Sequence, residues 1–235
     1  MGVSLEEIDQ IQELCKLSNV KLCINTWRRW DSIHDLISKK IKHGEIGKIQ
    51  SIFAQAHVGL VNTGIHIFDL INQYTDDEPI KVYGKILSDS SLDPGCLGVI
   101  EYRSGFLVSI DNSWKEQQRF GMIIQGELGR IEAFSNGVLL DSFTLQNSNG
   151  IIKTKRDPES KSPMYNALSD IHFSLTKGND TLSNPSTIRT AMETVAAFYE
   201  SNENYAPVNL PAKSMFYNKK FKCRLTSLTK NGKVK

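Results

Sequence analysis

The sequence predicts an α+β fold, in which helices cover one face of an open, mostly antiparallel sheet. Several strand-like apolar runs follow one another between residues 80 and 140, joined by turns that contain Gly, Asn, Asp or Ser. Connections this short suit antiparallel neighbours and leave no room for the long crossovers of parallel strands. Apolar residues at helical spacing precede and follow this run. A chain of 235 residues, 40% hydrophobic and 23% charged, is long enough for a substantial core.

The first predicted helix begins at a capping box formed by Ser4 and Glu7. Apolar residues then recur at helical spacing: Leu5, Ile8, Ile11, Leu14 and Cys15. Residues 20–24 predict a short strand, and the bulky, polar segment after it predicts a loop. Loops at strand ends often bind ligands, so Asn25 and Arg28 are candidate substrate-binding residues.

A second helix is predicted to begin at Asp31, a good N-cap residue, and to end at Gly44, which suits a helix end. A strand is then predicted over residues 49–56. Further strands are predicted over residues 80–86, 96–102, 106–112, 120–125, 130–134 and 137–140. Together these runs supply the expected antiparallel sheet.

The C-terminal part of the chain returns to helices. Residues 147–162 are polar and predict a loop. One helix is predicted around residues 164–175, and a second begins at Asn184, which is followed by Pro185 at a favourable first helical position. These helices are expected to cover one face of the sheet.

The charge of the chain is unevenly distributed. The segment 212–235 contains eight Lys or Arg residues and no acid, and since the overall net charge is +2, it leaves −6 on residues 1–211. Aromatic residues interleave with the lysines, as they do in some nucleic-acid-binding segments. A solvated basic C-terminal tail is the simpler interpretation, and no nucleic-acid partner is predicted.

The N-terminus lacks a basic region followed by an apolar one, and no apolar run approaches the roughly 18 residues of a membrane span. A cytoplasmic protein without a membrane partner is therefore expected. The four cysteines form no Cys-x-x-Cys pair and no short Cys-His spacing. Neither a metal site nor a disulfide framework is predicted.

The most informative segment is a predicted helix with a narrow polar stripe. At about 100° per residue, the side chains of Asn62, His66, Asp69 and Gln73 fall within roughly 60° of one another, while apolar residues fill the other directions. An imidazole between an amide and a carboxylate is typical of a cleft wall. The alternative, which the sequence leaves open, is that His66 is a structural, hydrogen-bonded histidine at a helix start.

In their order along residues 3–211, these segments resemble the glucose-fructose oxidoreductase, inositol dehydrogenase and MocA (Gfo/Idh/MocA) family of nicotinamide-dependent oxidoreductases. The segments that carry the resemblance are residues 4–7, 20–29, 44–49, 64–69, 126–129, 197–201 and 210–211. The resemblance implies that His66 lines the substrate pocket and helps to move the proton that accompanies hydride transfer. It places Asn62, where the family usually has Asp, beside the substrate, as in members that act on nucleotide-linked sugars. Asp69 is a further candidate substrate-binding residue.

The resemblance also implies a domain division. Family members begin with a Rossmann domain that carries Gly-x-Gly-x-x-Gly and a Glu-Lys-Pro motif with the catalytic Lys, and this sequence contains neither motif. Residues 1–28 resemble the last helix and strand of that domain, residues 29–211 form a substrate and oligomerisation domain, and residues 212–235 form the basic tail. NAD or NADP is the cofactor expected for the family, and the chain alone is not expected to bind it.

These implications leave more than one functional hypothesis. The first is the substrate-binding portion of an oxidoreductase that acts on a sugar, cyclitol or nucleotide-linked sugar, incomplete and inactive alone, with a separate nucleotide-binding chain as a partner. The second is a non-catalytic sugar-binding or subunit-pairing module, and the third is a truncated relic. In each case the open sheet face predicts a homo-oligomer.

Overall fold

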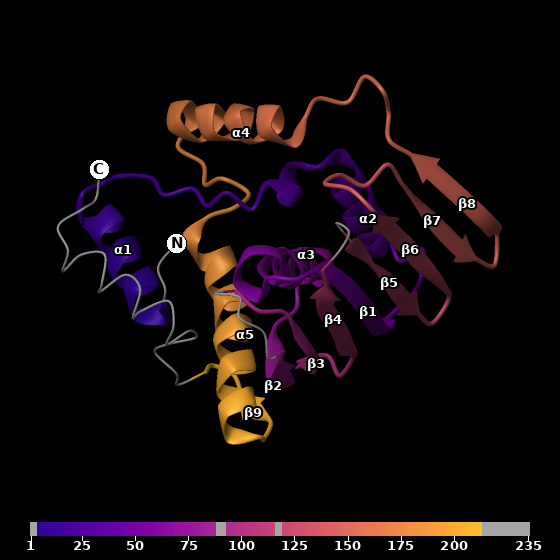
Figure 1. The fold of residues 1–235 in the computed structure, drawn as a ribbon. Helices are drawn as coiled ribbons and strands as arrows, with labels where there is room; N and C mark the ends of the chain where they lie inside the picture. The colour runs from indigo at the N-terminus through magenta and orange to yellow at the C-terminus, as the bar shows by residue number, and fades with distance from the viewer. Residues whose placement is uncertain (1–3, 88–92, 116–118, 213–235) are drawn as a thin grey trace.

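A computed structural model describes residues 4–87, 93–115 and 119–212 (Figure 1). Its α-helices are α1 (Leu5–Leu17), α2 (Ser32–Lys42), α3 (Ile65–Thr75), α4 (Pro163–Lys177) and α5 (Pro185–Asn204). A 3₁₀ turn, η1 (Trp27–Trp30), precedes α2, and a π-helical turn, η2 (Leu60–Gly64), precedes α3. The strands are β1 (Ile49–His57), β2 (Pro79–Ile86), β3 (Cys96–Tyr102), β4 (Leu107–Trp114), β5 (Phe120–Gly126), β6 (Gly129–Ser135), β7 (Ser142–Asn147), β8 (Gly150–Lys155) and β9 (Val208–Asn209).

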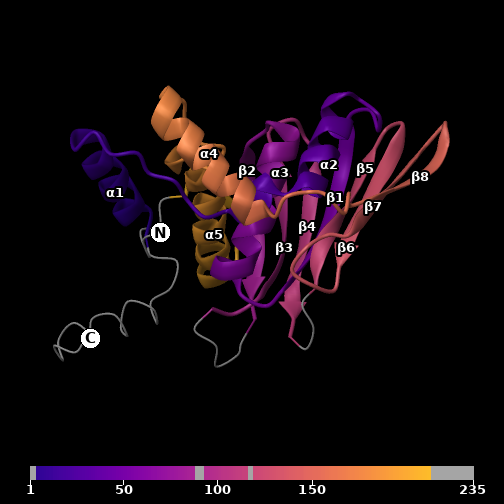
Figure 2. The ribbon, with the colours of Figure 1, turned by 90° about the horizontal axis from the view of Figure 1, so that it is seen from above.

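The strands form one nine-stranded sheet in the order β8-β7-β6-β5-β1-β4-β3-β2-β9. Every neighbouring pair is antiparallel except β1 and β4, which pair in parallel. The predicted α+β fold with a mostly antiparallel sheet is confirmed. The expectation that no parallel pair would form is wrong at one place, because α3, β2 and β3 together supply the long connection between β1 and β4. Figure 2 shows α2, α3 and α5 along one face of the sheet. The expectation that the helix at residues 164–175 would also cover this face is wrong, because α4 packs against η1 and leaves several large apolar side chains exposed.

The core lies between this helical layer and the sheet. Along β1, Ile52 and Ala54 are buried on the helical side, while Phe53 points to the opposite face and is exposed. Phe198 of α5 stacks on Phe68 of α3, with ring centroids 5.6 Å apart. The Phe198 ring packs directly against the backbone of β2 at Gly84, where an added Cβ would lie 2.2 Å from the ring.

The outer face of the sheet carries a row of side chains that the register aligns across five strands. In order from β2 to β5, the row consists of Tyr83, Val99, Ser109, Phe53 and Ile123. Tyr83, Val99 and Phe53 are exposed. We call these five residues the outer row.

Local signals at the helix starts predict the structure well. The Ser4 hydroxyl accepts a hydrogen bond from the Glu7 N–H at 3.1 Å, and the Asp31 carboxylate caps α2 by accepting from the Ile33 N–H at 2.9 Å. The Asn184 side chain accepts from the first N–H groups of α5. Each of these residues satisfies backbone donors that the first helical turn leaves unpaired.

Three segments differ from their predictions. Residues 20–24 form no strand, because the Ile24 N–H donates to the Ser183 carbonyl at 3.0 Å and the segment runs beside that turn instead of joining the sheet. Residues 137–140 are also not a strand, and β8 forms within the predicted loop 147–162. The basic tail lies outside the described residues, apart from its first residue. Within the described ranges, no helix is long and apolar enough to cross a membrane.

Candidate functional site

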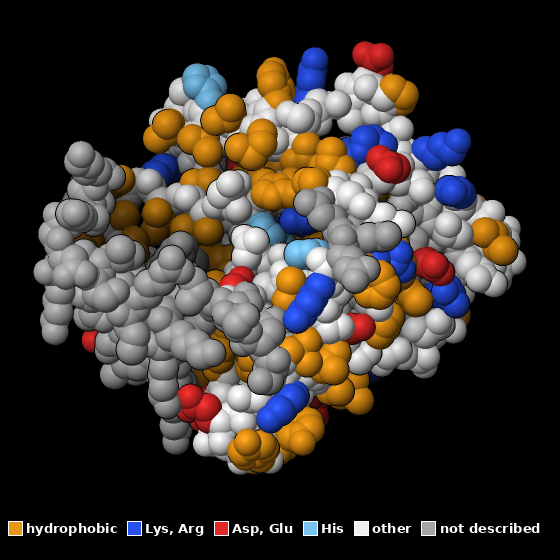
Figure 3. Space-filling view, in the orientation of Figure 1, with side chains coloured by type: hydrophobic (Ala, Val, Ile, Leu, Met, Phe, Trp, Pro, Cys, Tyr) orange, Lys and Arg blue, Asp and Glu red, His pale blue; other side chains and the backbone are white. Residues whose placement is uncertain are grey.

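The predicted residues His66, Asn62 and Arg28 come together at a pocket of about 330 Å³, which we call the His66 pocket. Its described lining consists of Trp27, Arg28, His57, Asn62, Thr63, His66, Arg119, Phe120, Gly137 and Val138. These side chains come from η1, the end of β1, η2, the start of α3, the start of β5 and the turn after β6. Figure 3 shows histidine side chains close to Lys or Arg side chains near the centre of this face.

The π-helical turn η2 positions Asn62 and Thr63 at the pocket. The Asp93 carboxylate accepts hydrogen bonds from the N–H groups of Val61 and Asn62, both at 2.8 Å. A carboxylate is favourable there because the start of a helix presents unpaired N–H groups and a partial positive charge. Gly59 precedes the turn with φ of +116°, and a Cβ at this position would lie 3.1 Å from the Asp93 carboxylate. The backbone here thus requires glycine.

His66 lies in the first turn of α3, with its ring centroid 6.3 Å from that of Trp27. Its Nδ1 is buried and makes no hydrogen bond within the described residues, so Nε2 is the ring nitrogen open to the pocket. Burial lowers the pKa of His66 to about 3, and the positive charge of Arg28 and the nearby His34 add to this effect. The imidazole is therefore neutral at pH 7. Neither Asn62 nor Asp69 fixes its tautomer, contrary to what the helical stripe suggests.

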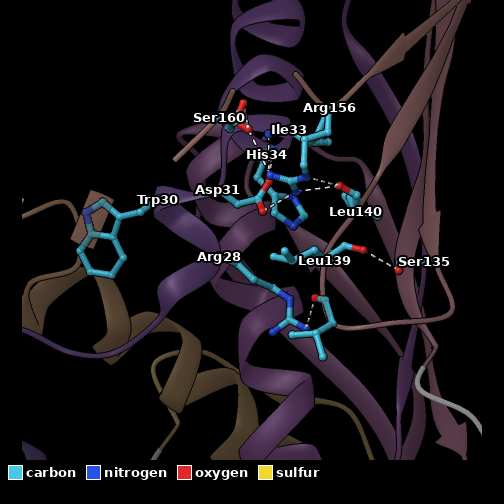
Figure 4. Close-up of polar contacts among 12 residues, drawn as sticks. Arg28, Trp30, Asp31, Ile33, His34, Ser135, Leu139, Leu140, Arg156 and Ser160 are labelled. Atoms are coloured by element: carbon cyan, nitrogen blue, oxygen red, sulfur yellow. Dashed lines mark hydrogen bonds and ion pairs between the residues drawn. The ribbon is translucent and has the colours of Figure 1, made fainter. Parts of the chain in front are cut away.

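Arg28 is 8% exposed and contacts two aromatic rings. Its guanidinium carbon is 4.3 Å from the centre of the Trp27 ring and 3.8 Å from the centre of the Phe120 ring. Within the described residues its only hydrogen bond runs from Nη2 to the Val138 carbonyl at 3.4 Å, and its Nε is buried without a partner (Figure 4). Burial lowers the pKa of Arg28 to about 10, which leaves the group charged at pH 7.

A second guanidinium, that of Arg119, also lines the pocket. It lies 4.4 Å over the Phe134 ring and donates to the side-chain oxygen of Asn136 at 3.1 Å. His57, at the end of β1, places its two ring nitrogens 3.1 Å from the carbonyl oxygens of Val58 and Lys115. No Asp or Glu is among the described lining residues. The pocket is therefore positively charged.

Asp69 does not line this pocket. The residue is 1% exposed. Its carboxylate accepts two hydrogen bonds from Arg29, one from Nε and one from Nη2, each at 2.8 Å. Burial raises the pKa of Asp69, while the bonds from Arg29 oppose that rise. Because both carboxylate oxygens are bound to a buried partner, Asp69 is not available to a substrate. Through this pair, Asp69 links η1 to α3.

Gln73 of the polar stripe and the candidate Asn25 also lie outside the His66 pocket. Gln73 lines a different pocket, together with Asn72 and acidic residues that follow α3. Asn25 is exposed and lines neither pocket. Trp27, Phe120 and Arg119 line the site without having been predicted. Only Trp27 had a local signal, since it is adjacent to Arg28 in the predicted loop.

A polar network around Arg156 holds together the segments next to the His66 pocket. Arg156 donates to the Asp31 carboxylate at 2.7 Å and to the Leu140 carbonyl, which holds the segment after β6 against the start of α2 (Figure 4). The His34 Nδ1 lies 2.5 Å from the Tyr74 hydroxyl. Burial lowers the pKa of His34 to about 3, so it too is neutral at pH 7.

A larger groove of about 800 Å³ lies between α1 and α4, and we call it the α1–α4 groove. Its lining includes Cys15 and Lys16 of α1, Leu22 after it, and Ile171 and Leu175 of α4. Large hydrophobic side chains are exposed on these elements: Ile11, Leu14, Leu17, Val20, Met164, Tyr165, Leu168, Phe173 and Leu175. Figure 3 shows hydrophobic side chains gathered around α4, at the top of the view. Such a surface is typical of a contact with another domain or chain.

No group of three or more His, Cys, Asp or Glu side chains that could hold a metal ion occurs within the described ranges.

Residues 34–132 match the family model described as "GFO/IDH/MocA C-terminal domain". A comparison with curated protein sequences gives no significant match.

Solved structures resemble the chain closely in fold. An aldose-aldose oxidoreductase from Caulobacter crescentus, complexed with glycerol, has a TM-score of 0.82 at 14% identity, over 89% of this chain and 70% of that one. The WlbA dehydrogenase from Bordetella pertussis, in complex with NADH and UDP-GlcNAcA, has a TM-score of 0.73 at 16% identity, over 90% of this chain and 70% of that one. An oxidoreductase from Agrobacterium radiobacter, in complex with NAD+, L-tartaric acid and magnesium, has a TM-score of 0.71 at 15% identity, over 88% and 70%. At these identities the likeness shows a shared fold.

Proposed function

We propose that this chain, whose residues 34–132 match a Gfo/Idh/MocA C-terminal domain, binds the substrate of a nicotinamide-dependent oxidoreductase acting on a sugar, cyclitol or nucleotide-linked sugar. The observation that carries the proposal is the placement of His66 in a pocket of about 330 Å³ beside Asn62 and Thr63. An imidazole, an amide and a hydroxyl suit the recognition of sugar hydroxyls. The similar structures of an aldose-aldose oxidoreductase, of an oxidoreductase with NAD+, and of a dehydrogenase with NADH and UDP-GlcNAcA support the same class.

The nicotinamide cofactor, when bound in such an enzyme, accepts a hydride from a carbon that bears a hydroxyl. This chain fits only the substrate side, because its sequence has no glycine-rich loop for the pyrophosphate. In our proposal His66 takes the hydroxyl proton at Nε2, since Nδ1 is buried without a partner. Asn62 orients the hydroxyl and does not titrate.

We assign the α1–α4 groove to a contact with the nucleotide-binding unit that the reaction requires. Leu22, Ile171 and Leu175 line the groove, and further exposed leucines lie on α1 and α4. The ion pair from Arg189 of α5 to Asp9, at 2.7 Å, ties α1 to α5. The proposed cofactor, NAD or NADP, would be held by that unit.

The outer row supports a further proposal, that two copies of the chain pair through the outer sheet face. Tyr83, Val99 and Phe53 are exposed and aligned across neighbouring strands. An apolar face of this kind is typical of an interface between subunits.

A second candidate function is a sugar-binding or subunit-pairing module without a redox step. The low pKa of His66 favours it, because an imidazole with a pKa of about 3 is a weak base at neutral pH. The outer row favours the subunit-pairing role directly.

The experiment that tests the first proposal compares His66→Ala with His172→Ala, a control at an exposed histidine of α4. In an active assembly with a nucleotide-binding partner, His66→Ala is expected to lower turnover by about 10² to 10⁴, the usual contribution of a general acid or base. Circular dichroism checks that each variant is folded. Unchanged turnover in folded His66→Ala, or an equal loss in His172→Ala, would contradict the proton-transfer role.

A further inference from the structure

We propose that the substrate bound in the His66 pocket carries an anionic group, a carboxylate or a phosphate, and that Arg28 binds it. This inference rests on the proposed sugar-binding function and adds a charge requirement to it. It begins from two arginines that are adjacent in the sequence and equally buried, Arg28 and Arg29, each 8% exposed. The two differ in their partners, and the difference singles out Arg28.

Arg29 is fully engaged by protein groups. It makes a two-bond ion pair with Asp69 and donates further to the Leu182 carbonyl at 3.3 Å. Arg28 has five N–H hydrogens and uses one of them, in a weak bond to the Val138 carbonyl at 3.4 Å. Its Nη1 has no hydrogen-bond partner within the described residues. A buried charge without a partner is costly, so the fold leaves this guanidinium ready for an anion from outside.

The surroundings hold the Arg28 guanidinium in place. Trp27 and Phe120 lie at 4.3 and 3.8 Å from its central carbon, measured to their ring centres. Because Nε is buried, the Nη1 and Nη2 groups are the ones left for a ligand. A guanidinium edge matches a carboxylate or a phosphate through two parallel hydrogen bonds. Because the rings fix the side chain in advance, little conformational entropy is lost on binding.

No nearby carboxylate competes for Arg28. Asp31 influences it electrostatically, but the Asp31 side chain is bound by Arg156 at 2.7 Å and caps α2 at the Ile33 N–H. Arg119 adds a second positive charge to the same pocket, and its hydrogen bonds go to neutral amides, Gln55 and Asn136. An anion in this pocket would therefore meet two guanidinium groups and no described acid.

An anion bound to Arg28 would also lessen a difficulty in the proposed proton transfer, the low pKa of His66. The positive charge of Arg28 helps to keep the pKa of His66 at about 3, after the larger effect of burial. An anion bound to Arg28 offsets that charge and raises the pKa of His66 toward its ordinary value. An anionic substrate would thus make the imidazole a better proton acceptor than a neutral one does.

The test measures binding of three probes to the full chain by calorimetry: glucuronate, glucose 6-phosphate and glucose. At least one of the two anionic probes is expected to bind ten-fold or more tightly than glucose, and comparing the two identifies the anionic group. Arg28→Gln is expected to abolish this preference. Arg103→Gln, at an exposed arginine whose partner is Glu78, is the matched control and is expected to keep it.

The native protein gives two further readouts, which apply even where Arg28→Gln does not fold. The affinity of the anionic probe should fall as NaCl rises from 50 to 500 mM, while that of glucose stays constant. The pKa of His66, followed by NMR, should rise when the anionic probe is bound. Equal, salt-independent affinity for all three probes overturns the anionic inference and leaves the sugar-binding proposal standing. If none of the probes binds, both proposals fail.

Discussion

The ion pair between Arg29 and Asp69 gives a prediction that separates a structural carboxylate from a substrate-binding one. Asp69→Ala removes both hydrogen bonds to Arg29, at 2.8 Å each, and leaves a guanidinium with little access to water. Asp69 was a candidate substrate-binding residue from the sequence. The structure instead predicts that its loss weakens the fold.

The magnitude follows from the burial of both partners, whose side chains are 9% and 2% exposed. Removing one member of a buried ion pair typically costs about 3 to 5 kcal/mol, because the other charge stays buried without compensation. For a chain of this size, each kcal/mol lowers the melting temperature by roughly 2 to 4 °C. Asp69→Ala is therefore expected to lower it by roughly 6 to 20 °C.

Urea unfolding followed by circular dichroism measures the effect. The control is Asp35→Ala, which breaks an exposed pair with Lys39 at 2.7 Å and is expected to cost only about 0.3 to 0.5 kcal/mol. In a double-mutant cycle, Arg29→Ala combined with Asp69→Ala should cost less than the sum of the two single changes. Additive changes, or an unchanged midpoint with weaker ligand binding, would refute the structural role.

Two other predictions concern the histidines and the outer row. His34 and His66 each have a pKa lowered to about 3, below an unfolded value of about 6.5, so the unfolded state binds more protons between these limits. The free energy of unfolding should therefore fall with decreasing pH in this window, by up to about 1.4 kcal/mol per pH unit for each histidine. In His34→Asn, the urea midpoint should change less between pH 7 and pH 5 than it does in the native chain. Phe53→Lys is expected to convert a dimer into monomers in sedimentation, while Ile151→Lys on the edge strand β8 leaves it intact. A native chain that is already monomeric at micromolar concentration would contradict the proposed pairing.

The helix starts could be predicted from the sequence because their determinants are local. Ser4, Asp31 and Asn184 each bond to N–H groups two or three residues further along the chain. The parallel pairing of β1 with β4 depends instead on contacts between residues such as Ser51 and Leu107, which are 56 positions apart. No local pattern encodes that choice, and the strand predicted at residues 20–24 failed for the same reason.

The polar stripe was only partly informative because a helix face does not have one environment along its length. Asn62 belongs to a π-helical turn, where the angle per residue is smaller than the 100° assumed for the whole segment. His66 then faces the pocket, while Asp69, one turn later, faces Arg29. Phe120, the first residue of β5, and Arg119 just before it reach the site from across the sheet, and nothing near them in the sequence indicates it.

The two adjacent arginines show what the structure adds to such a pattern. The sequence places Arg28 and Arg29 in one bulky, polar segment and selects Arg28 as a candidate only from its place in that loop, with no information on the partners of either side chain. Their partners do so, since Arg29 is neutralised within the fold while Arg28 departs from the rule that buried charges are paired. Departures of this kind are expected where a site, and not the fold, has determined the residue. Because η1 carries both side chains, the ion pair that holds η1 against α3 also sets the position of the unpaired guanidinium beside His66.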